Sequence, residues 1–542
     1  MEVQERLNCC IEVIREAFDT AAEADRNWSG KQNKPPLYGI PFSVKGNFYM
    51  PGYDCCIGLA KFLDQPRLEE CTFVTHLRNI GAVSLIFFPL PVKFSLFSVP
   101  FVITNVPQAL ISFVCSNSVY GTTLNPNDVT RSPGGSSGGE GALFMAGGSA
   151  FGIGSDLAGS LRIPAAFCGF VTLKPTEGRF VVENTNPGVP GRSRLALSFG
   201  FYTHTVENQV ALLKTIIGDP SYREIVPRSI PAPLDEKVCF IVRYFTCVKR
   251  CVQDTVERLR QEGHELVRFT VPDVDEMVQV LYKLITSDGG RYLQALYGND
   301  IVDNYMKEFV MLLKLITSDG GRYLQALYGN DIVDKYMKEF VMLLKRCCTI
   351  HKILSFFQIP NCLRYVASCL LRGISPQLSA LCSAYVSNLE DLRYTQELCD
   401  AYKQKNHVTY AFLYLSLQFT EYWKKLGIDA LICPTFPVPA VPHQYPSRMS
   451  TAATYTALFN LLDFPAGAVP AGKPLLQIIT ALGYNIVLKT MRDAAAKSVG
   501  LPLSVQVVTL PFEEEKCLRV MGEVEKVWKE DYSSEDLVIL SD

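Results

Sequence analysis

The chain lacks an excess of charge of either sign. Its 542 residues include 52 Lys and Arg against 54 Asp and Glu, which gives a formal net charge of −2 at pH 7. A protein that binds a nucleic-acid backbone carries a basic surface, because the bound phosphates must be neutralised. With 48% hydrophobic and 20% charged residues, the chain also differs from disordered and fibrous proteins. We therefore expect a folded protein with a large core and no nucleic-acid partner.

Patterns that would indicate a disulfide framework or a metal centre are also lacking. The 18 cysteines are scattered singles or neighbours such as Cys9 and Cys10, and their density is well below that of a disulfide scaffold. The six histidines are far apart in sequence, and no cysteine spacing matches a zinc finger or a zinc ribbon. We expect reduced thiols in a cytosolic setting, with no metal ion and no other cofactor.

The sequence contains no convincing secretion signal or membrane span. The N-terminus carries acidic residues among its apolar ones, which favours an amphipathic helix over a signal peptide. Residues 83–103 are strongly apolar, but three prolines and Lys93 interrupt them, so we do not expect a spanning helix there. The predicted localisation is cytoplasmic, or peripheral on intracellular membranes.

Short β-favouring runs and segments of helical periodicity are both present, which predicts one α/β domain over residues 1–542. The expected strands include 35–44, 100–104, 151–156 and 503–508, and the expected helices include 140–147, 251–263 and 513–529. In the last of these, apolar residues recur at steps of three and four, which is typical of a helix that closes a core.

One segment of the chain is duplicated. Residues 284–314 recur as residues 315–345 with a single change, from Asn304 to Lys335. Solenoids are built from about three or more repeats, which have usually diverged. Two nearly identical copies indicate instead a recent exon duplication or a faulty gene model, and we expect one copy to fill its place in the fold.

Residues 125–176 are dense in Gly and Ser, as expected where backbone N–H groups approach a ligand. A phosphate cradle is disfavoured, because GGSSGGEG lacks the Gly-Lys-Ser/Thr ending. Residues 134–138 match the G-x-S-x-G pattern of a nucleophile elbow, but the polar run NPNDVTRSP precedes them where an apolar strand is required.

A third interpretation rests on family motifs. The stretch GGSSGGEGAL with GIGSDLAGSLRIPAAFCGFVTLKP resembles the amidase signature family, and PLYGIPFSVKG, TNVPQAL, LLDFPAG and SVGLPLSVQ are similar to its fatty-acid amide hydrolase branch. The resemblance runs from about residue 8 to about residue 528. It is broken at 84–99, which we interpret as an insertion, and at one copy of the duplication. It implies an α/β amidase-signature fold, with a central twisted mixed β-sheet covered on both faces by α-helices.

The resemblance also implies a catalytic triad of Lys45, Ser136 and Ser160. Ser160 would be the nucleophile, Ser136 the bridging serine and Lys45 the base. A serine hydroxyl is a weak nucleophile until a neighbouring base removes its proton. Lysine can be that base only if burial lowers its pKa toward neutrality. Returning the proton to the leaving amine is the step that suits such a site to amides.

Further site residues follow from the same resemblance. The backbone N–H groups of Leu157, Ala158, Gly159 and Ser160 would form the oxyanion hole, although the family has glycine in place of Ala158, a difference that matters if φ is positive there. We interpret Asp156 and Arg162 as braces of this loop, and Ser137 as structural.

The implied substrate is a small-molecule lipid amide. Leu110, Ile111 and Phe113 fall where the family lines its acyl tunnel, although an ordinary core strand would show the same apolar pattern. Residues 351–373 combine apolar and basic side chains where the family has a membrane-facing cap, so a membrane surface is an expected partner. A homodimer stays open. The transmembrane helix that usually begins vertebrate members is missing before Lys45, which indicates peripheral binding or a truncated start.

Two alternatives remain. One is an amidase with another substrate, such as a glutaminase-like member of a tRNA amidotransferase. The other is a lipid-binding homologue without catalysis, because the insertion, the duplication or Ala158 would each be able to spoil the site.

Overall fold

The computed structural model of the chain describes residues 2–28, 37–80, 98–180, 182–188, 195, 197–219, 222, 242–244, 249–272, 277–278, 280–281, 292, 296–297, 300–307, 407–473 and 486–529. Its α-helices are α1 Glu2–Leu7, α2 Glu16–Trp28, α3 Thr72–Asn79, α4 Gly138–Met145, α5 Arg162–Cys168, α6 Val206–Gly218, α8 Lys249–Gln261, α18 His407–Lys425, α19 Thr454–Leu461, α20 Ile486–Ala495 and α21 Glu514–Trp528. Its strands are β1 Cys10–Val13, β2 Pro41–Lys45, β3 Val99–Thr104, β4 Ser116–Asn117, β5 Gly121–Thr122, β6 Phe151–Asp156, β7 Val171–Lys174, β8 Ser198–Thr203, β9 Val242–Tyr244, β10 Leu266–Arg268, β11 Ala430–Pro434, β12 Ala466–Pro470 and β13 Ser504–Val508.

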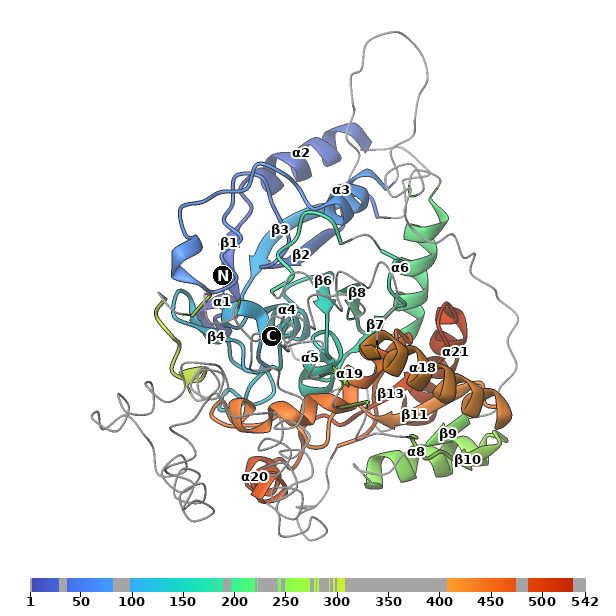
Figure 1. The fold of residues 1–542 in the computed structure, drawn as a ribbon. Coiled ribbons are helices and arrows are strands. Elements are labelled where there is room, and N and C mark those ends of the chain that lie inside the picture. The colour runs from blue at the N-terminus through green and yellow to red at the C-terminus, as the bar shows by residue number, and fades with distance from the viewer. Residues whose placement is uncertain are drawn as a thin grey trace, which may run out of the picture.

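Within these residues, 11 strands form one mixed sheet in the order β1-β3-β2-β6-β8-β7-β12-β13-β11-β9-β10 (Figure 1). Strand β2 lies parallel to both of its neighbours, β3 and β6. From β6 through β8, β7, β12 and β13 to β11, every neighbouring pair is antiparallel. The mixed sheet therefore agrees with the expected fold class, and it places the end of β2 between two parallel neighbours.

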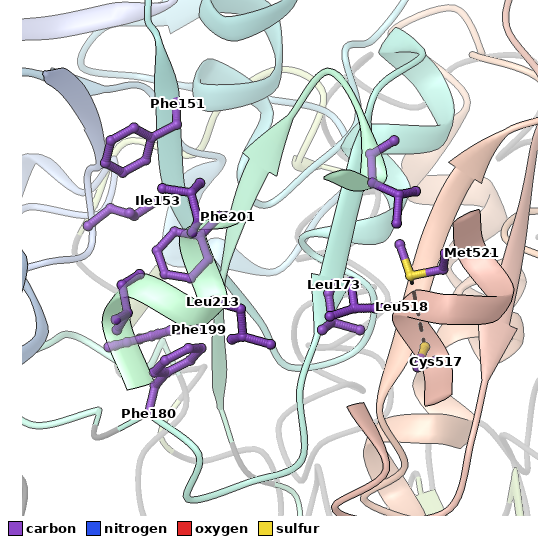
Figure 2. Packing of buried hydrophobic residues seen from close by; sticks show 14 of the residues in the cluster. Phe151, Ile153, Leu173, Phe180, Phe199, Phe201, Leu213, Cys517, Leu518 and Met521 are labelled. Atoms are coloured by element: carbon purple, nitrogen blue, oxygen red, sulfur yellow. Dashed lines mark hydrogen bonds between the residues drawn. The ribbon is translucent and has the colours of Figure 1, made fainter. Parts of the chain in front are cut away.

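One face of the sheet carries large apolar side chains. Figure 2 shows Phe151 and Ile153 of β6 and Phe199 and Phe201 of β8 on the side where Leu213 of α6 also lies. Because side chains alternate across a strand, these residues at steps of two share one face. Helices α2, α3, α6, α8 and α21 supply the other half of this buried cluster.

The opposite face of the sheet is covered by a second layer of helices. Between the phenylalanines, β6 carries Gly152 and Gly154 and β8 carries Gly200 and Tyr202. Helices α4 and α5 pack here, with Tyr202 in a buried cluster with Phe144 and Phe170. Helices α18 and α19 cover the part of the sheet formed by β11 and β12. The prediction of helices on both faces is thus confirmed.

Most of the expected elements are present with small differences in their bounds. Strands β3, β6 and β13 and helices α4, α8 and α21 match the ranges expected from sequence to within a few residues. The strand expected at 35–44 is shorter at its start, because residues 37–39 form a turn with Gly39 at φ +73° and β2 begins only at Pro41. Val99, assigned to the insertion from sequence, is the first residue of β3 and belongs to the core sheet.

The first copy of the duplicated segment contacts the body of the fold through hydrogen bonds. The Tyr297 hydroxyl donates to the Gln108 carbonyl oxygen at 3.0 Å, and Gln108 Nε2 donates to the Ile301 carbonyl oxygen at 2.7 Å. Ser116 Oγ donates to Asp303 Oδ2 at 3.0 Å. The second copy, most of the expected insertion and the expected cap at 351–373 lie outside the described residues.

Across the part of the chain that the structure describes, none of the helices has the length and hydropathy needed to cross a membrane.

Candidate active site

Lys45, the last residue of β2, lies at the centre of the site. Its side chain is fully buried. Its Nζ is hydrogen-bonded to Ser136 Oγ at 2.8 Å, and it donates to Ser155 Oγ at 2.8 Å and to the Ser155 carbonyl oxygen at 3.3 Å. The structure thus joins the end of β2 to β6 and to the Gly/Ser-rich loop before α4, and it brings together two of the three residues of the predicted triad.

Burial decides the charge of this lysine. It lowers the pKa of Lys45 from 10.5 to about 7, while the negative charge of Asp156 acts in the opposite direction. A neutral amine has two N–H groups and one lone pair. If the two acceptors of Ser155 take the two N–H groups, the lone pair is left for the Ser136 hydroxyl. Lys45 can therefore accept a proton from Ser136 near neutral pH.

The loop that carries Ser136 is held between other parts of the core. Ser136 is only 3% exposed, and the Gly135–Ser136 peptide bond is cis. Ser132 Oγ donates to the Phe113 carbonyl oxygen at 2.6 Å and accepts from the Gly134 N–H at 3.1 Å. These bonds fix the loop beside the segment that contains Phe113.

Ser160 follows the end of β6 and is more exposed than Ser136, as expected of a residue that meets a substrate. Its carbonyl oxygen accepts from the Ser137 N–H at 3.3 Å and from the Tyr202 hydroxyl at 3.4 Å. Ser137 Oγ donates to the Ser155 carbonyl oxygen at 3.2 Å. Ser137 therefore connects the two serine-bearing loops, which agrees with a structural role.

Asp156 and Arg162 brace the Ser160 loop, as predicted. Arg162 Nε and Nη2 donate to the two oxygens of Asp156, each at 3.0 Å, and both side chains are fully buried. Burial raises the pKa of Asp156, but the charge and hydrogen bonds of Arg162 outweigh it and hold the pKa well below its ordinary value. Arg162 also donates to the Thr456 carbonyl oxygen and to Asn460 Oδ1, so α19 supports the loop from outside.

The predicted set of four oxyanion donors needs a correction at Gly159. Its N–H donates to Asp156 Oδ1 at 2.7 Å, and a backbone N–H already bonded to a carboxylate is not free for a substrate oxygen. Among the described residues, the N–H groups of Leu157, Ala158 and Ser160 have no hydrogen-bond partner. Ala158 is not one of the described residues with positive φ, so an alanine there causes no backbone strain.

The expected acyl-binding residues lie in two apolar clusters. Leu110 and Ile111 pack against the cluster that includes Tyr297 and Met306 of the first duplicated copy. Phe113 belongs to a different cluster, where its ring contacts Phe436 edge-on with centroids 5.1 Å apart. Phe113 is therefore beside the Ser136 loop, and Leu110 and Ile111 face another part of the chain.

Sequence reasoning missed Ser155. It lies one residue before Asp156, inside the family motif, and it supplies two of the three acceptors around Lys45 Nζ. The register of β2 against β6, which pairs Val44 with Ile153, brings it close. A signal was present in the sequence, because Ser155 is the one hydroxyl residue in the strand FGIGSD.

Comparison with known proteins gives the class first: the chain is an amide hydrolase. The family model described as Amidase matches residues 1–91, 95–330 and 364–518. The chain therefore belongs to the amidase family, and the recognition made from its motifs is confirmed.

Two relatives with the name fatty acid amide hydrolase are similar to most of the chain. The chain is 31% identical over 516 residues to fatty-acid amide hydrolase 1 of Sus scrofa, which covers 91% of this chain and 76% of that protein. It is 28% identical over 520 residues to fatty acid amide hydrolase 1 of Caenorhabditis elegans, which covers 91% and 77%.

Solved structures show the same fold. A fatty acid amide hydrolase structure matches with a TM-score of 0.71 at 21% identity, covering 98% of this chain and 80% of that chain. A glutamyl-tRNA(Gln) amidotransferase structure from Thermotoga maritima matches with a TM-score of 0.57 at 18% identity, covering 96% and 88%.

Proposed function

We propose that the chain hydrolyses long-chain fatty acid amides to a free fatty acid and an amine, with Ser160 as nucleophile, Ser136 as proton relay and Lys45 as base. The observation that carries this proposal is the 2.8 Å hydrogen bond between Lys45 Nζ and Ser136 Oγ, made by a lysine that is fully buried. A buried, uncharged amine next to a serine hydroxyl is the arrangement that general-base activation of a serine requires.

The proposed reaction has two halves. Ser160 Oγ attacks the amide carbon while its proton passes to Ser136 Oγ, whose own proton passes to Lys45 Nζ. The N–H groups of Leu157, Ala158 and Ser160 stabilise the oxyanion of the tetrahedral intermediate. The C–N bond then breaks, and the leaving amine takes the proton back from Lys45 through Ser136. Water then attacks the acyl carbon while its proton passes through Ser136 to Lys45. The bond between the acyl carbon and Ser160 Oγ breaks, the fatty acid is released, and the proton returns through Ser136 to restore the Ser160 hydroxyl.

The substrate class rests on apolar residues and on the relatives. Leu110, Ile111 and Phe113 are apolar, and a long acyl chain gains about 0.8 kcal/mol for each methylene removed from water. The Sus scrofa and Caenorhabditis elegans relatives are named fatty acid amide hydrolases. A peripheral membrane contact through residues 351–373 belongs to the same proposal and rests on the sequence alone.

The test is hydrolysis of an oleoyl amide by the purified chain, compared with Ser160→Ala, Ser136→Ala and the matched control Ser118→Ala. We expect activity in the wild type and the control, and loss of at least about a thousandfold in the other two. Turnover of glutamine instead of the lipid amide would favour the glutaminase-like alternative. A folded wild type that turns over neither amide, and whose Ser160 does not react with a fluorophosphonate, would favour a lipid-binding homologue.

A further inference from the structure

Helix α19 supports the segment that carries the proposed oxyanion donors. The side chain of Thr456 is fully buried, and its Oγ1 donates to the Ala158 carbonyl oxygen at 2.6 Å. The same hydroxyl lies 2.9 Å from the Ala453 carbonyl oxygen, so the shorter bond is the one to Ala158. One turn later in α19, Asn460 Nδ2 donates to the Asp156 carbonyl oxygen at 3.2 Å. One face of this helix therefore holds the backbone of the donor segment at two positions.

The peptide unit between Ala158 and Gly159 is held at both of its polar atoms. Its oxygen accepts from Thr456 Oγ1, and its N–H donates to Asp156 Oδ1 at 2.7 Å. Because a peptide unit is planar, these two bonds fix the orientation of the whole unit. The N–H groups of Ala158 and Ser160 belong to the peptide units on either side. The directions of these two N–H groups therefore depend on the unit that Thr456 and Asp156 hold.

Thr456 reaches this peptide unit because the residue next to it has no side chain. A Cβ atom on Gly159 would lie 2.1 Å from Thr456 Oγ1 and 2.7 Å from Thr456 Cβ. The backbone of Thr456 is itself anchored, because its carbonyl oxygen accepts from Arg162 Nη1 at 3.0 Å. Arg162 also binds Asp156, the acceptor of the Gly159 N–H. The two bonds to the Ala158–Gly159 peptide thus come from one connected and fully buried group of side chains.

We propose that Thr456 is a positioning residue for the oxyanion hole, because its hydroxyl holds the N–H groups of Ala158 and Ser160 in the direction of the substrate oxygen. The inference rests on the proposed function of these N–H groups and of Ser160 as nucleophile. Donors stabilise an oxyanion most when they are held in place before its charge develops. The carbonyl oxygen of the bound substrate carries less charge than the oxyanion. Loss of the Thr456 hydroxyl should therefore slow the chemical step more than it weakens substrate binding.

The test is the hydrolysis of an oleoyl amide by the purified chain and by Thr456→Val, which replaces the hydroxyl with a methyl group. We expect kcat to fall by about 10- to 100-fold and KM to stay within about twofold. Thr456→Ser retains the hydroxyl and should recover most of kcat. Thr255→Val is the matched control, because the buried Thr255 hydroxyl donates to the Cys251 carbonyl oxygen at 2.7 Å in α8, on the other face of the sheet. This control should leave kcat within about twofold of the wild type.

A long-chain trifluoromethyl ketone supplies a readout that a merely structural role would not change. Ser160 Oγ bonds to the ketone carbon, the Ser160 proton passes through Ser136 to Lys45, and the ketone oxygen becomes an oxyanion. In Thr456→Val, the dissociation constant of this adduct should rise by about the factor by which kcat/KM falls. The matching long-chain alcohol has no carbonyl group, so its dissociation constants for the wild type and the variant should agree within about twofold.

Thr456→Ala replaces Thr456→Val if the latter fails to fold, because it removes the hydroxyl without placing a methyl group against the Ala158 carbonyl oxygen. An unchanged kcat in the folded variant overturns the inference, and so does an equal loss of kcat in Thr456→Ser or in Thr255→Val. If the wild type hydrolyses no oleoyl amide but forms the ketone adduct, equal dissociation constants of the adduct in the wild type and the variant overturn the inference. A wild type that hydrolyses no lipid amide and forms no adduct overturns the proposed function instead.

Discussion

Lys45 Nζ donates to both the hydroxyl and the carbonyl oxygen of Ser155, at 2.8 Å and 3.3 Å. Ser155 Oγ lies 3.5 Å from Asn47 Oδ1, to which it can donate, and Asn47 in turn is buried. One residue thus occupies two of the directions around the amine. The third direction points to Ser136, to which the proposed mechanism assigns the proton relay. Ser155 is only 1% exposed and therefore holds the amine from inside the core.

The first prediction concerns Ser155→Ala. The variant removes one acceptor and leaves the amine free to rotate, so the lone pair is no longer aimed at Ser136. We expect fluorophosphonate labelling of Ser160 to slow by about tenfold or more, and the free energy of unfolding to fall by only about 1 kcal/mol. Ser155→Thr retains the hydroxyl and should recover most of the rate. Equal rates for Ser155→Ala and the wild type would show that the carbonyl oxygen alone orients Lys45.

The second prediction is the pH dependence of the nucleophile. Burial lowers the pKa of Lys45 to about 7, so the neutral amine predominates above that pH and the protonated form below it. The labelling rate of Ser160 should therefore fall by up to about tenfold for each pH unit below the midpoint. Lys45→Arg should be unreactive throughout, because a guanidinium does not lose its proton in this range. An acid limb above pH 9 would mean that Lys45 titrates like an exposed lysine.

The third prediction concerns Gly159, which has a φ of +123°. A Cβ atom there would lie 2.1 Å from Thr456 Oγ1, the hydroxyl that donates to the Ala158 carbonyl oxygen at 2.6 Å. Backbone strain and this overlap together should lower the free energy of unfolding of Gly159→Ala by about 2 to 4 kcal/mol. The neighbouring Ala158→Gly is the control and should change it by less than about 1 kcal/mol. Thermal unfolding of both variants decides the point, and a stable Gly159→Ala would show that the loop can rearrange.

The sequence was informative about this site wherever a motif is local. Lys45, Ser136 and Ser160 each lie inside a short motif, and so do Asp156 and Arg162, whose bracing role the hydrogen bonds confirm. What the sequence did not reveal depends on strand register and on distant partners. Ser155 reaches Lys45 only through the pairing of β2 with β6, 110 residues apart in sequence.

The hydrogen bonds that hold residues 157–160 also depend on partners that are distant in sequence. Arg162 donates to Thr456, Asn460 and Gln506, which lie 294, 298 and 344 residues further along the chain. The engagement of the Gly159 N–H by Asp156 is local, but it depends on a side-chain direction that residue types do not specify. Helices and strands, in contrast, follow from apolar periodicity, which is why the bounds of β3, β6, β13, α4, α8 and α21 were predicted to within a few residues.

The fourth prediction concerns the duplicated segment. The first copy contacts the core through residues that the second copy repeats: Asp300 accepts from the N–H groups of Ala60 and Lys61, each at 3.2 Å, and Asp303 accepts from Ser116. The single difference between the copies is Asn304, an exposed residue whose side chain accepts a hydrogen bond from Lys307 Nζ. The second copy therefore contains every residue type through which the described residues of the first copy contact the core.

Deleting residues 315–345 should leave the fold and the labelling of Ser160 intact, because the first copy and its contacts are untouched. Deleting residues 284–314 instead gives the same chain with Lys335 in the place of Asn304, and a change at one exposed position should alter the free energy of unfolding by no more than about 0.5 kcal/mol. Thermal unfolding and labelling of both deletions measure this. Asp303→Ala in the first deletion is the control, because it removes a contact to the core and should be clearly less stable. If the chain without residues 315–345 unfolds while the full chain does not, the second copy is part of the folded core. One copy then cannot replace the other.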